Sequence, residues 1–324
     1  MSDFALPEAL QRGIDECIGG ISGRDIAVRT AALSGHYRAH ASSRIAILNE
    51  VDIAAYLVAR LPATYAATLA AIEAVKVRMP DFAPRSMLDA GCGPGTASWA
   101  ALECWGVEQI TLLDENDAML RAARTLQSFS GSEALRGASI IKSGVPEHLP
   151  ANPHDLVVLA YALAELPESR WSAALSVLWR GTASVLLIVE PGTPEGYRRI
   201  LAARAMLLEL GAHVAAPCPH DAACPLTAPD WCHFAQRLPR SRDHMRAKGG
   251  AVPFEDEKFS YLAVTRDAPL GTPSARILDR PKAEKAGFRF KLCNAGGLAD
   301  LLLPKRDKPA YRAVSRKKWG ETLD

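Results

Sequence analysis

Several features that would place a chain in a special class of protein are missing from this sequence of 324 residues. No run of 18 apolar residues exists, and the apolar segment 184–189 has only the length of a strand, so we expect no membrane-spanning segment. The first residues have neither the basic start of a signal peptide nor the Arg-rich character of a transit peptide, which predicts a cytoplasmic protein. A hydrophobic fraction of 48% and a charged fraction of 23% are typical of a globular chain.

Cysteine occurs seven times, and this odd number without a signal peptide argues against a disulfide framework. Three cysteines are isolated and are expected to be small apolar residues: Cys17, Cys92 and Cys104. The other four include three within one proline-rich stretch of fifteen residues and one further along the chain: Cys218, Cys224, Cys232 and Cys293.

The net charge of +2 hides an uneven distribution. Residues 276–324 carry 13 Lys or Arg and 6 Asp or Glu, a local net charge of +7. A basic segment indicates a polyanionic partner such as a nucleic acid, although a solvated surface has the same composition. Tyr311 and Trp319 interleave with the cations and are rings that can stack on bases. The candidate RNA-binding residues are Lys305, Arg306, Lys308, Arg312, Arg316, Lys317 and Lys318.

A strand, a tight turn and a helix start are predicted at 86–101, where an apolar pair ends in an acid and three glycines follow at alternate positions. Glycine lets the backbone approach a ligand closely, and a helix N-terminus offers N–H groups to an anion. A second strand, 109–114, ends in an acid that can hold ribose hydroxyls. This pattern resembles motif I and the next strand end of class I S-adenosylmethionine (SAM) methyltransferases. A structural glycine turn in another α/β domain is the alternative. The candidate SAM-binding residues are Asp89, Gly91, Gly93, Gly95 and Asp114.

Strand and helix patterns alternate from residue 85 to about 211, which predicts an α/β fold with a doubly wound, mostly parallel sheet. The expected strands are 86–90, 109–114, 138–142, 155–160 and 184–190, and the expected helices lie near 95–105, 116–128, 168–180 and 194–211. Shorter strands are expected at 259–265, 275–278 and 288–292. The expected division is an N-terminal helical segment 1–80, a SAM-binding Rossmann-like domain 81–212, a Cys-rich cluster-binding and β extension 213–304, and a basic tail 305–324.

The four non-isolated cysteines form a candidate metal site, because thiolates suit Zn²⁺ and iron–sulfur clusters. Structural zinc sites usually contain tighter C-x₂₋₄-C pairs, and the wide spacings favour a 4Fe–4S cluster over Zn²⁺. His220 and His233 are substitute ligands to consider, and unrelated buried cysteines are the alternative. The tight C-x₃-C-x₂-C loop of radical SAM enzymes is missing from the three clustered cysteines, so we expect a structural cluster.

Taken together, four motifs resemble the methyltransferase-like small-ribosomal-subunit assembly family, which includes the mitochondrial small-subunit assembly factor and bacterial relatives. They are Leu88-Asp-Ala-Gly-Cys-Gly-Pro-Gly-Thr-Ala-Ser-Trp-Ala100, Val189-Glu-Pro-Gly-Thr-Pro-Glu-Gly196, Cys218-Pro-His-Asp-Ala-Ala-Cys-Pro-Leu226 and Trp231-Cys-His-Phe234. The resemblance implies a class I SAM fold, a four-cysteine 4Fe–4S site, and binding to small-subunit rRNA within a ribosomal assembly intermediate. It implies a SAM-dependent rRNA methyltransferase that is monomeric off the ribosome, or a non-catalytic assembly factor with the same fold.

Catalytic residues remain unknown from the sequence. The Asn/Asp-Pro-Pro-aromatic motif of enzymes that methylate base amines is replaced by Ala160-Tyr-Ala-Leu-Ala-Glu165 at the end of the fourth expected strand. No candidate cysteine nucleophile falls at that position. Tyr161 and Glu165 are candidates for a general base by position only, and pocket wall or helix surface is the simpler interpretation of both.

Overall fold

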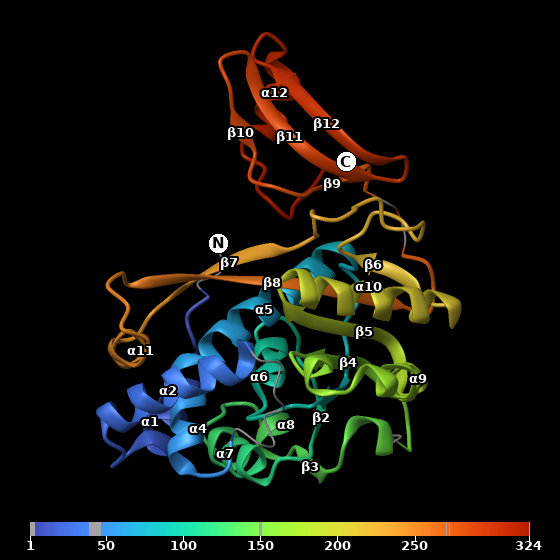
Figure 1. Cartoon of the computed structure of the whole chain (residues 1–324). Coiled ribbons are helices and arrows are strands. Elements are labelled where there is room, and N and C mark those ends of the chain that lie inside the picture. The colour runs from blue at the N-terminus through green and yellow to red at the C-terminus, as the bar shows by residue number, and fades with distance from the viewer. Residues whose placement is uncertain (1–3, 39–46, 149–150, 270, 272, 324) are drawn as a thin grey trace.

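An eight-stranded sheet forms the centre of the computed structural model, which describes residues 4–38, 47–148, 151–269, 271 and 273–323 (Figure 1). Its strand order is β3-β2-β1-β4-β5-β8-β6, and β7 pairs with the outer part of β8. Strands β1 to β5 are parallel, and β8 is antiparallel to β5 and β6. The strands are β1 Ser86–Ala90, β2 Gln109–Asp114, β3 Ser139–Lys142, β4 His154–Ala160, β5 Thr182–Pro191, β6 His213–Ala216, β7 Phe234–Pro239 and β8 Phe254–Thr265.

Both faces of this sheet are buried under helices, as the continuous apolar pattern of its strands requires. Along β4, Leu156 and Val158 pack into the core on one face, and Val157 and Leu159 pack into the core on the other. The first face is covered by α1 Glu8–Ile18, α2 Gly23–Arg38, α4 Glu50–Ala59, α5 Leu61–Arg78, α6 Thr96–Leu102 and α7 Asp117–Ser128. The second is covered by α9 Trp171–Arg180 and α10 Pro194–Glu209. The predicted fold class is therefore confirmed.

The N-terminal helices pack on the sheet through α5, and α4, which meets α5 at Arg60, packs on α5, α2 and α7. Asn49 and Asp52 form a capping box that starts α4. Residues 1–3 and 39–46 of the expected helical segment lie outside the described residues. No single described helix is long and apolar enough to span a membrane; α4 and α5, which bend by 47° at their junction, pass that test only as a pair. Twelve of the 18 residues of α5 are buried within the protein.

A second, five-stranded sheet stands apart from the large one at the C-terminal end of the chain (Figure 1). It contains β9 Ala275–Ile277, β10 Lys282–Ala283, β11 Gly287–Asn294, β12 Gly297–Pro304 and β13 Thr322–Leu323, with α12 Lys308–Val314 packed on it. The described structure also contains five short helical elements: α8 Glu133–Arg136, α11 Arg242–Lys248, η1 Val145–Glu147, η2 Leu163–Glu165 and η3 Glu168–Arg170.

The segment 213–304 is thus divided between two sheets. Strands β6, β7 and β8 complete the large sheet, so the expected boundary near residue 212 falls inside it. The segment expected as a basic tail, 305–324, contains α12 and β13 and is part of the second sheet unit. The reason is long-range strand pairing, which a local hydrophobic pattern does not reveal.

Candidate functional site

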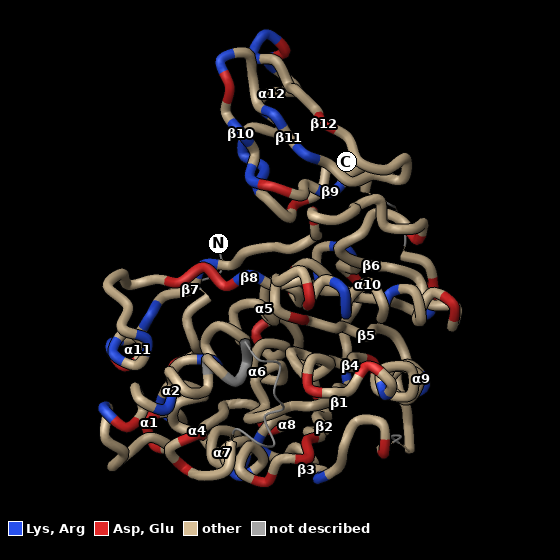
Figure 2. The backbone as a smooth tube through the Cα atoms, in the orientation of Figure 1, with Lys and Arg blue, Asp and Glu red and all other residues tan. Residues whose placement is uncertain are grey.

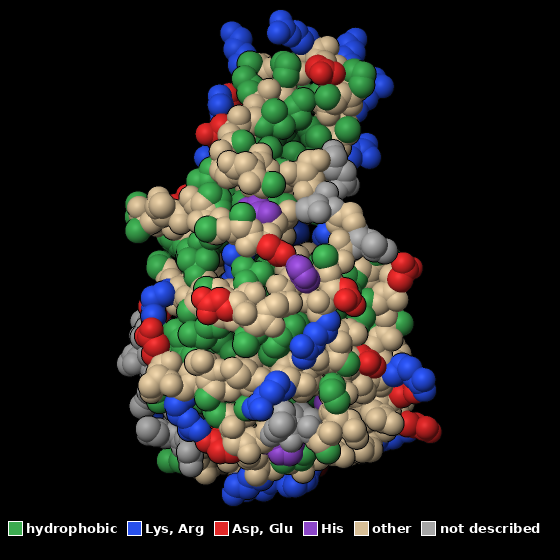
Figure 3. All heavy atoms as spheres, turned by 90° about the vertical axis from the view of Figure 1, so that its right-hand side faces the viewer, with side chains coloured by type: hydrophobic (Ala, Val, Ile, Leu, Met, Phe, Trp, Pro, Cys, Tyr) green, Lys and Arg blue, Asp and Glu red, His purple; other side chains and the backbone are tan. Residues whose placement is uncertain are grey.

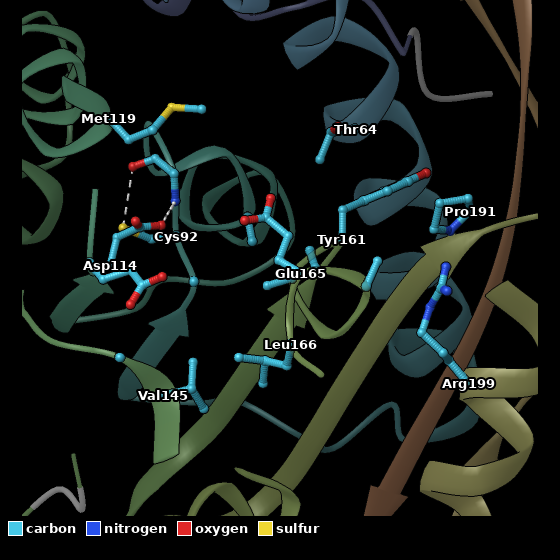
Figure 4. A pocket seen from close by; sticks show the side chains of 18 of the residues that line it. Thr64, Cys92, Asp114, Met119, Val145, Tyr161, Glu165, Leu166, Pro191 and Arg199 are labelled. Carbon is cyan, nitrogen blue, oxygen red and sulfur yellow. Dashed lines mark hydrogen bonds between the residues drawn. The ribbon is translucent and has the colours of Figure 1, made fainter. Parts of the chain in front are cut away.

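A cavity of about 1140 Å³ opens at the carboxyl ends of the parallel strands, where β1 lies between β2 and β4 (Figure 4). This is the switch point at which open α/β sheets bind ligands. Four of the five predicted SAM-binding residues line the cavity: Asp89, Gly91, Gly93 and Asp114. Gly95 does not line it and instead precedes the first turn of α6.

The glycine turn needs its glycines for two reasons. Gly91 and Gly93 have φ values of 63° and 53°, a region that side chains rarely adopt. A Cβ atom added to Gly91 would also lie only 2.5 Å from the Cβ atom of Ala162, which follows β4. The turn and the end of β4 are therefore in direct contact.

Asp89 holds the turn to the following helix. Its buried carboxylate accepts hydrogen bonds from the backbone N–H and the hydroxyl of Ser98, at 3.0 and 2.9 Å. Burial raises the pKa of Asp89 to about 7, although the Ser98 bonds oppose this shift. The role of Asp89 in the free protein is to fasten β1 to α6.

Asp114 at the end of β2 also stabilises the glycine turn through hydrogen bonds. Its Oδ2 accepts from the N–H of Gly93 at 2.8 Å, and its Oδ1 accepts from the N–H of Asn116 at 2.8 Å. Burial raises the pKa of Asp114, and the two backbone bonds oppose the rise. Each oxygen keeps a second lone pair, so the carboxylate can also accept hydroxyl groups from a ligand in the cavity.

The rest of the cavity is lined by residues after β4, on α5 and on α10, and they include Tyr161 and Glu165, which the sequence indicated by position only. Figure 4 shows Glu165 pointing into the cavity between the glycine turn and the α5 residue Thr64. Tyr161 lies beside them, and burial raises the pKa of Tyr161 well above its ordinary value, which makes its phenol a poor general base. Arg199 on α10 pairs with Glu190 at 2.6 Å in a fully buried contact. No local pattern indicated Thr64 or Arg199, because separate elements bring them to the cavity.

All four predicted metal-ligating cysteines line a second, smaller cavity of about 30 Å³, together with Tyr197 and Arg204 of α10. Three come from the loop between β6 and β7, and Cys293 comes from β11 of the second sheet. The Tyr197 hydroxyl lies 3.1 Å from the Sγ atom of Cys224. Burial raises the pKa of Cys232 well above its ordinary value and that of Cys293 to about 12. Within the described ranges, no group of three or more His, Cys, Asp or Glu side chains has the arrangement of a preformed metal site.

Two arginines beside the cysteine cavity have buried N–H groups without a hydrogen-bond partner in the described structure: Nη2 of Arg276 and Nε of Arg204. Arg276 is 4% exposed and donates from Nε to the Pro217 carbonyl at 2.7 Å. The sulfur atoms of a thiolate-bound metal centre carry negative charge. They would therefore accept hydrogen bonds from these unpaired buried N–H groups. The donor set therefore fits a four-thiolate centre.

The two histidines considered as substitute ligands have different surroundings. The Nε2 atom of His220 lies 3.5 Å from the Sγ atom of Cys293. His233 stacks on Trp231 and meets the edge of Trp319, with ring centroids 4.9 and 5.0 Å apart. Trp319 is therefore half-buried, and its ring packs against His233 and Phe234.

The candidate RNA-binding residues lie on α12 and the turns around it. Six are exposed (Lys305, Arg306, Lys308, Arg312, Arg316 and Lys318), and Lys317 is half-buried. Figures 2 and 3 show Lys and Arg gathered around the far end of the second sheet unit. Tyr311 packs against Phe288 with ring centroids 5.5 Å apart. The cations thus stand on a folded surface and not on a flexible tail.

Comparison with known proteins gives matches over most of the chain. The human protein described as "Ribosome assembly protein METTL17, mitochondrial" is 29% identical over 304 residues, which cover 83% of this chain and 61% of that protein. "Rsm22-cox11 tandem protein 2, mitochondrial" of Schizosaccharomyces pombe is 23% identical over 328 residues, covering 85% of this chain and 43% of that protein. This chain therefore spans less than two thirds of the length of either relative.

Among solved structures, magnesium protoporphyrin IX methyltransferase of Synechocystis PCC 6803 with bound SAM aligns with a TM-score of 0.42 and 14% identity, covering 64% of this chain and 82% of that one. The family model described as "Mitochondrial small ribosomal subunit Rsm22" matches residues 50–324. That match includes the glycine turn, the four cysteines and the second sheet. The chain belongs to the Rsm22 family.

Proposed function

We propose that this protein binds SAM in the large cavity and acts in assembly of the small ribosomal subunit, as a methyltransferase of its rRNA. The observation that carries the proposal is the family match. It covers the part of the chain in which the glycine turn and Asp114, at the end of β2, line one cavity at the switch point of the sheet. The printed names of the relatives refer to ribosome assembly and to the small ribosomal subunit, and the proposal extends these roles to this chain.

Bound SAM would supply an activated methyl group. Asp114 would accept the ribose hydroxyls, and the glycine turn would let the donor lie against the backbone. The protein's own contribution is positioning, since methyl transfer needs a nucleophile in line with the methyl group. Glu165 is the carboxylate that points into the cavity from the β4 end, and it is the candidate for orienting an acceptor.

The test combines donor binding with modification mapping. Titration calorimetry measures SAM affinity, and rRNA modification maps compare a deletion strain complemented with the wild-type protein or with Gly93→Arg. A Cβ atom at Gly93 would lie 3.9 Å from the Tyr56 hydroxyl, so the arginine would extend into the cavity and block the donor. One modification should be lost in the deletion strain and in the Gly93→Arg strain. Identical maps in all strains would contradict methyl transfer.

A second candidate function is a non-catalytic assembly factor with the same fold. It is favoured by the end of β4, where Tyr161 with a raised pKa replaces the motif of base-amine methyltransferases. In that case the maps are identical, and the Gly93→Arg strain assembles small subunits normally. Failure of assembly with a folded Gly93→Arg variant that binds RNA would show that donor occupancy matters and would contradict this alternative.

The four cysteines are proposed to hold a structural 4Fe–4S cluster, with Zn²⁺ as the alternative. Their convergence on one cavity and the unpaired N–H groups of Arg204 and Arg276 support a four-thiolate centre. Such a centre would join the β6–β7 loop to β11, and its binding free energy would stabilise both. Anaerobically purified protein should contain about four iron and about four sulfide per chain. Stoichiometric zinc without sulfide would contradict the cluster.

The basic surface of α12 is proposed to bind the phosphates of small-subunit rRNA. Lys308, Arg312 and Arg316 are spaced four residues apart and exposed. Replacing all three by glutamine should lower rRNA affinity and reduce the slope of log affinity against log salt by up to about 2 to 3, since each lost phosphate contact contributes about 0.7 to 0.9. A double glutamine variant of the exposed α7 residues Arg121 and Arg124 is the control. An unchanged slope in the triple variant would contradict the assignment.

A further inference from the structure

Tyr161 has a backbone conformation that its side chain does not favour. Its φ is 59°, and among the residues that the structure describes it is the one non-glycine residue with a positive φ. A bulky residue in this region costs about 1 to 3 kcal/mol, which the surrounding structure must overcome. Strain of this kind at a ligand cavity points to a function for the residue that bears it.

The surrounding contacts come from three parts of the chain. The Tyr161 hydroxyl donates to Oε1 of Glu257 on β8 at 3.1 Å. Arg60, at the junction of α4 and α5, pairs with the same oxygen at 3.2 Å, and its guanidinium lies 4.7 Å from the centroid of the Tyr161 ring. The backbone N–H of Tyr161 donates to Val189 of β5 at 2.7 Å. Glu257 is only 12% exposed, so this network is shielded from water.

The network lies at one end of the large cavity. Tyr161 and Arg60 both line the cavity, and the next residue, Ala162, packs against the glycine turn. Glu257 lies beyond the part of β8 that pairs with β5, on the ribbon that β8 forms with β7. Tyr161 is thus in contact both with the helical N-terminal segment, through Arg60, and with the β7–β8 ribbon, through Glu257. It lies beside the place where an acceptor would meet a bound donor.

We propose that Arg60, Tyr161 and Glu257 form a latch that closes the acceptor end of the cavity, so that Tyr161 controls which groups reach a bound donor. Arg60 and Glu257 are positioning residues, and they act through Tyr161. An acceptor enters when the hydroxyl leaves Glu257 and the strained backbone of Tyr161 relaxes. The latch is a property of the free chain, and only its role toward an acceptor rests on the proposed function.

Hydrogen exchange of residues 160–167 in the ligand-free full chain tests the latch. Tyr161→Phe removes the donated hydrogen bond and keeps the ring, and Glu257→Gln removes the charge that holds Arg60. Each should speed exchange of this segment by about tenfold or more, as expected when a hydrogen bond to a charged group is lost. Asp256→Asn is the matched control, because Asp256 pairs with Arg237 on the same ribbon and is not part of the Arg60–Tyr161–Glu257 network. Unchanged exchange in both latch variants, or an equal rise in the control, would overturn the proposal.

Donor release provides a second measurement. Tyr161→Gly removes the ring, and glycine adopts the positive φ without strain. SAM should dissociate from this variant at least about tenfold faster than from the wild type, because a hydrogen-bond network with a charged group is lost. Equal dissociation rates would overturn the claim that Tyr161 closes the cavity. If the wild type does not bind SAM at all, the proposed function fails, and the exchange experiment still decides whether the latch exists.

Discussion

The two cavities on either side of α10 are built in opposite ways. The part of the large cavity around the glycine turn depends on one strand, turn and helix of consecutive residues, and the carboxylates of Asp114 and Asp89 accept hydrogen bonds from Gly93 in that turn and from Ser98 in the helix. The cysteine cavity depends on a loop without regular structure and on one residue of another sheet, Cys293. Both cavities have buried side-chain groups without a hydrogen-bond partner in the described structure: hydroxyls of Thr64 and Thr96 at the large one, and N–H groups of Arg204 and Arg276 at the cysteine cavity.

If the proposed ligands bind, this difference predicts that the donor would contribute little to the fold at the first site and the metal centre much at the second. A site made from local structure is stabilised by the sheet around it. A site that joins distant loops gains its order from whatever its side chains bind. The helix α10 serves both sites, because Arg199 lines the large cavity and Arg204 lines the smaller one.

The largest effect is expected from Cys232→Ser. Loss of one of the four thiolates should abolish the proposed metal binding and lower the free energy of unfolding by several kcal/mol, since a bound metal's binding free energy would be folding free energy. Metal analysis and thermal unfolding measure both quantities. Cys17→Ser, at a half-buried cysteine of α1, is the control and should cost about 1 kcal/mol. Equal stability of the two variants would contradict the claim that the cysteine cavity is stabilised by what its side chains bind.

A smaller loss is expected from Gly91→Ala. The positive φ alone costs about 1 to 3 kcal/mol, and the added Cβ must also displace Ala162. Denaturant unfolding should show this loss, with weaker SAM binding by calorimetry. Gly131→Ala is the control, because its added Cβ would have no heavy atom within 4 Å. If Gly91→Ala unfolded like the control, the turn would not be rigidly built.

The smallest effect is expected from a change of one pH unit, acting through Asp89. Its folded pKa of about 7 lies above its ordinary value of 3.8, so the fold favours the protonated form, and this contribution is lost as pH rises from about 4 to 7. Relative to Asp89→Asn, the wild type should lose about 1.4 kcal/mol per pH unit in this window. Urea unfolding of both proteins at several pH values measures the difference. Parallel curves would contradict the burial of an ionisable carboxyl group here.

Local patterns predicted much of the large sheet. The expected strands 86–90 and 109–114 agree with β1 and β2 at both ends, because a short apolar run followed by an acid and glycine is a local signal. The helix α12 was not predicted, although Asp307 as N-cap and Pro309 in the first turn are typical of a helix N-terminus. The strands β6 and β7 were missed because their pairing partner, β8, lies far along the chain.

The sequence by itself determined the fold class, the glycine turn, the set of four cysteines and the basic C-terminal segment, since each is carried by neighbouring residues or by composition. Only the tertiary structure decided that the four cysteines share one cavity, that the basic segment is a folded surface, and that Arg60 and Glu257 hold Tyr161. The physical reason is that side chains from distant elements meet through strand pairing and helix packing, which depend on the whole chain and leave no local pattern.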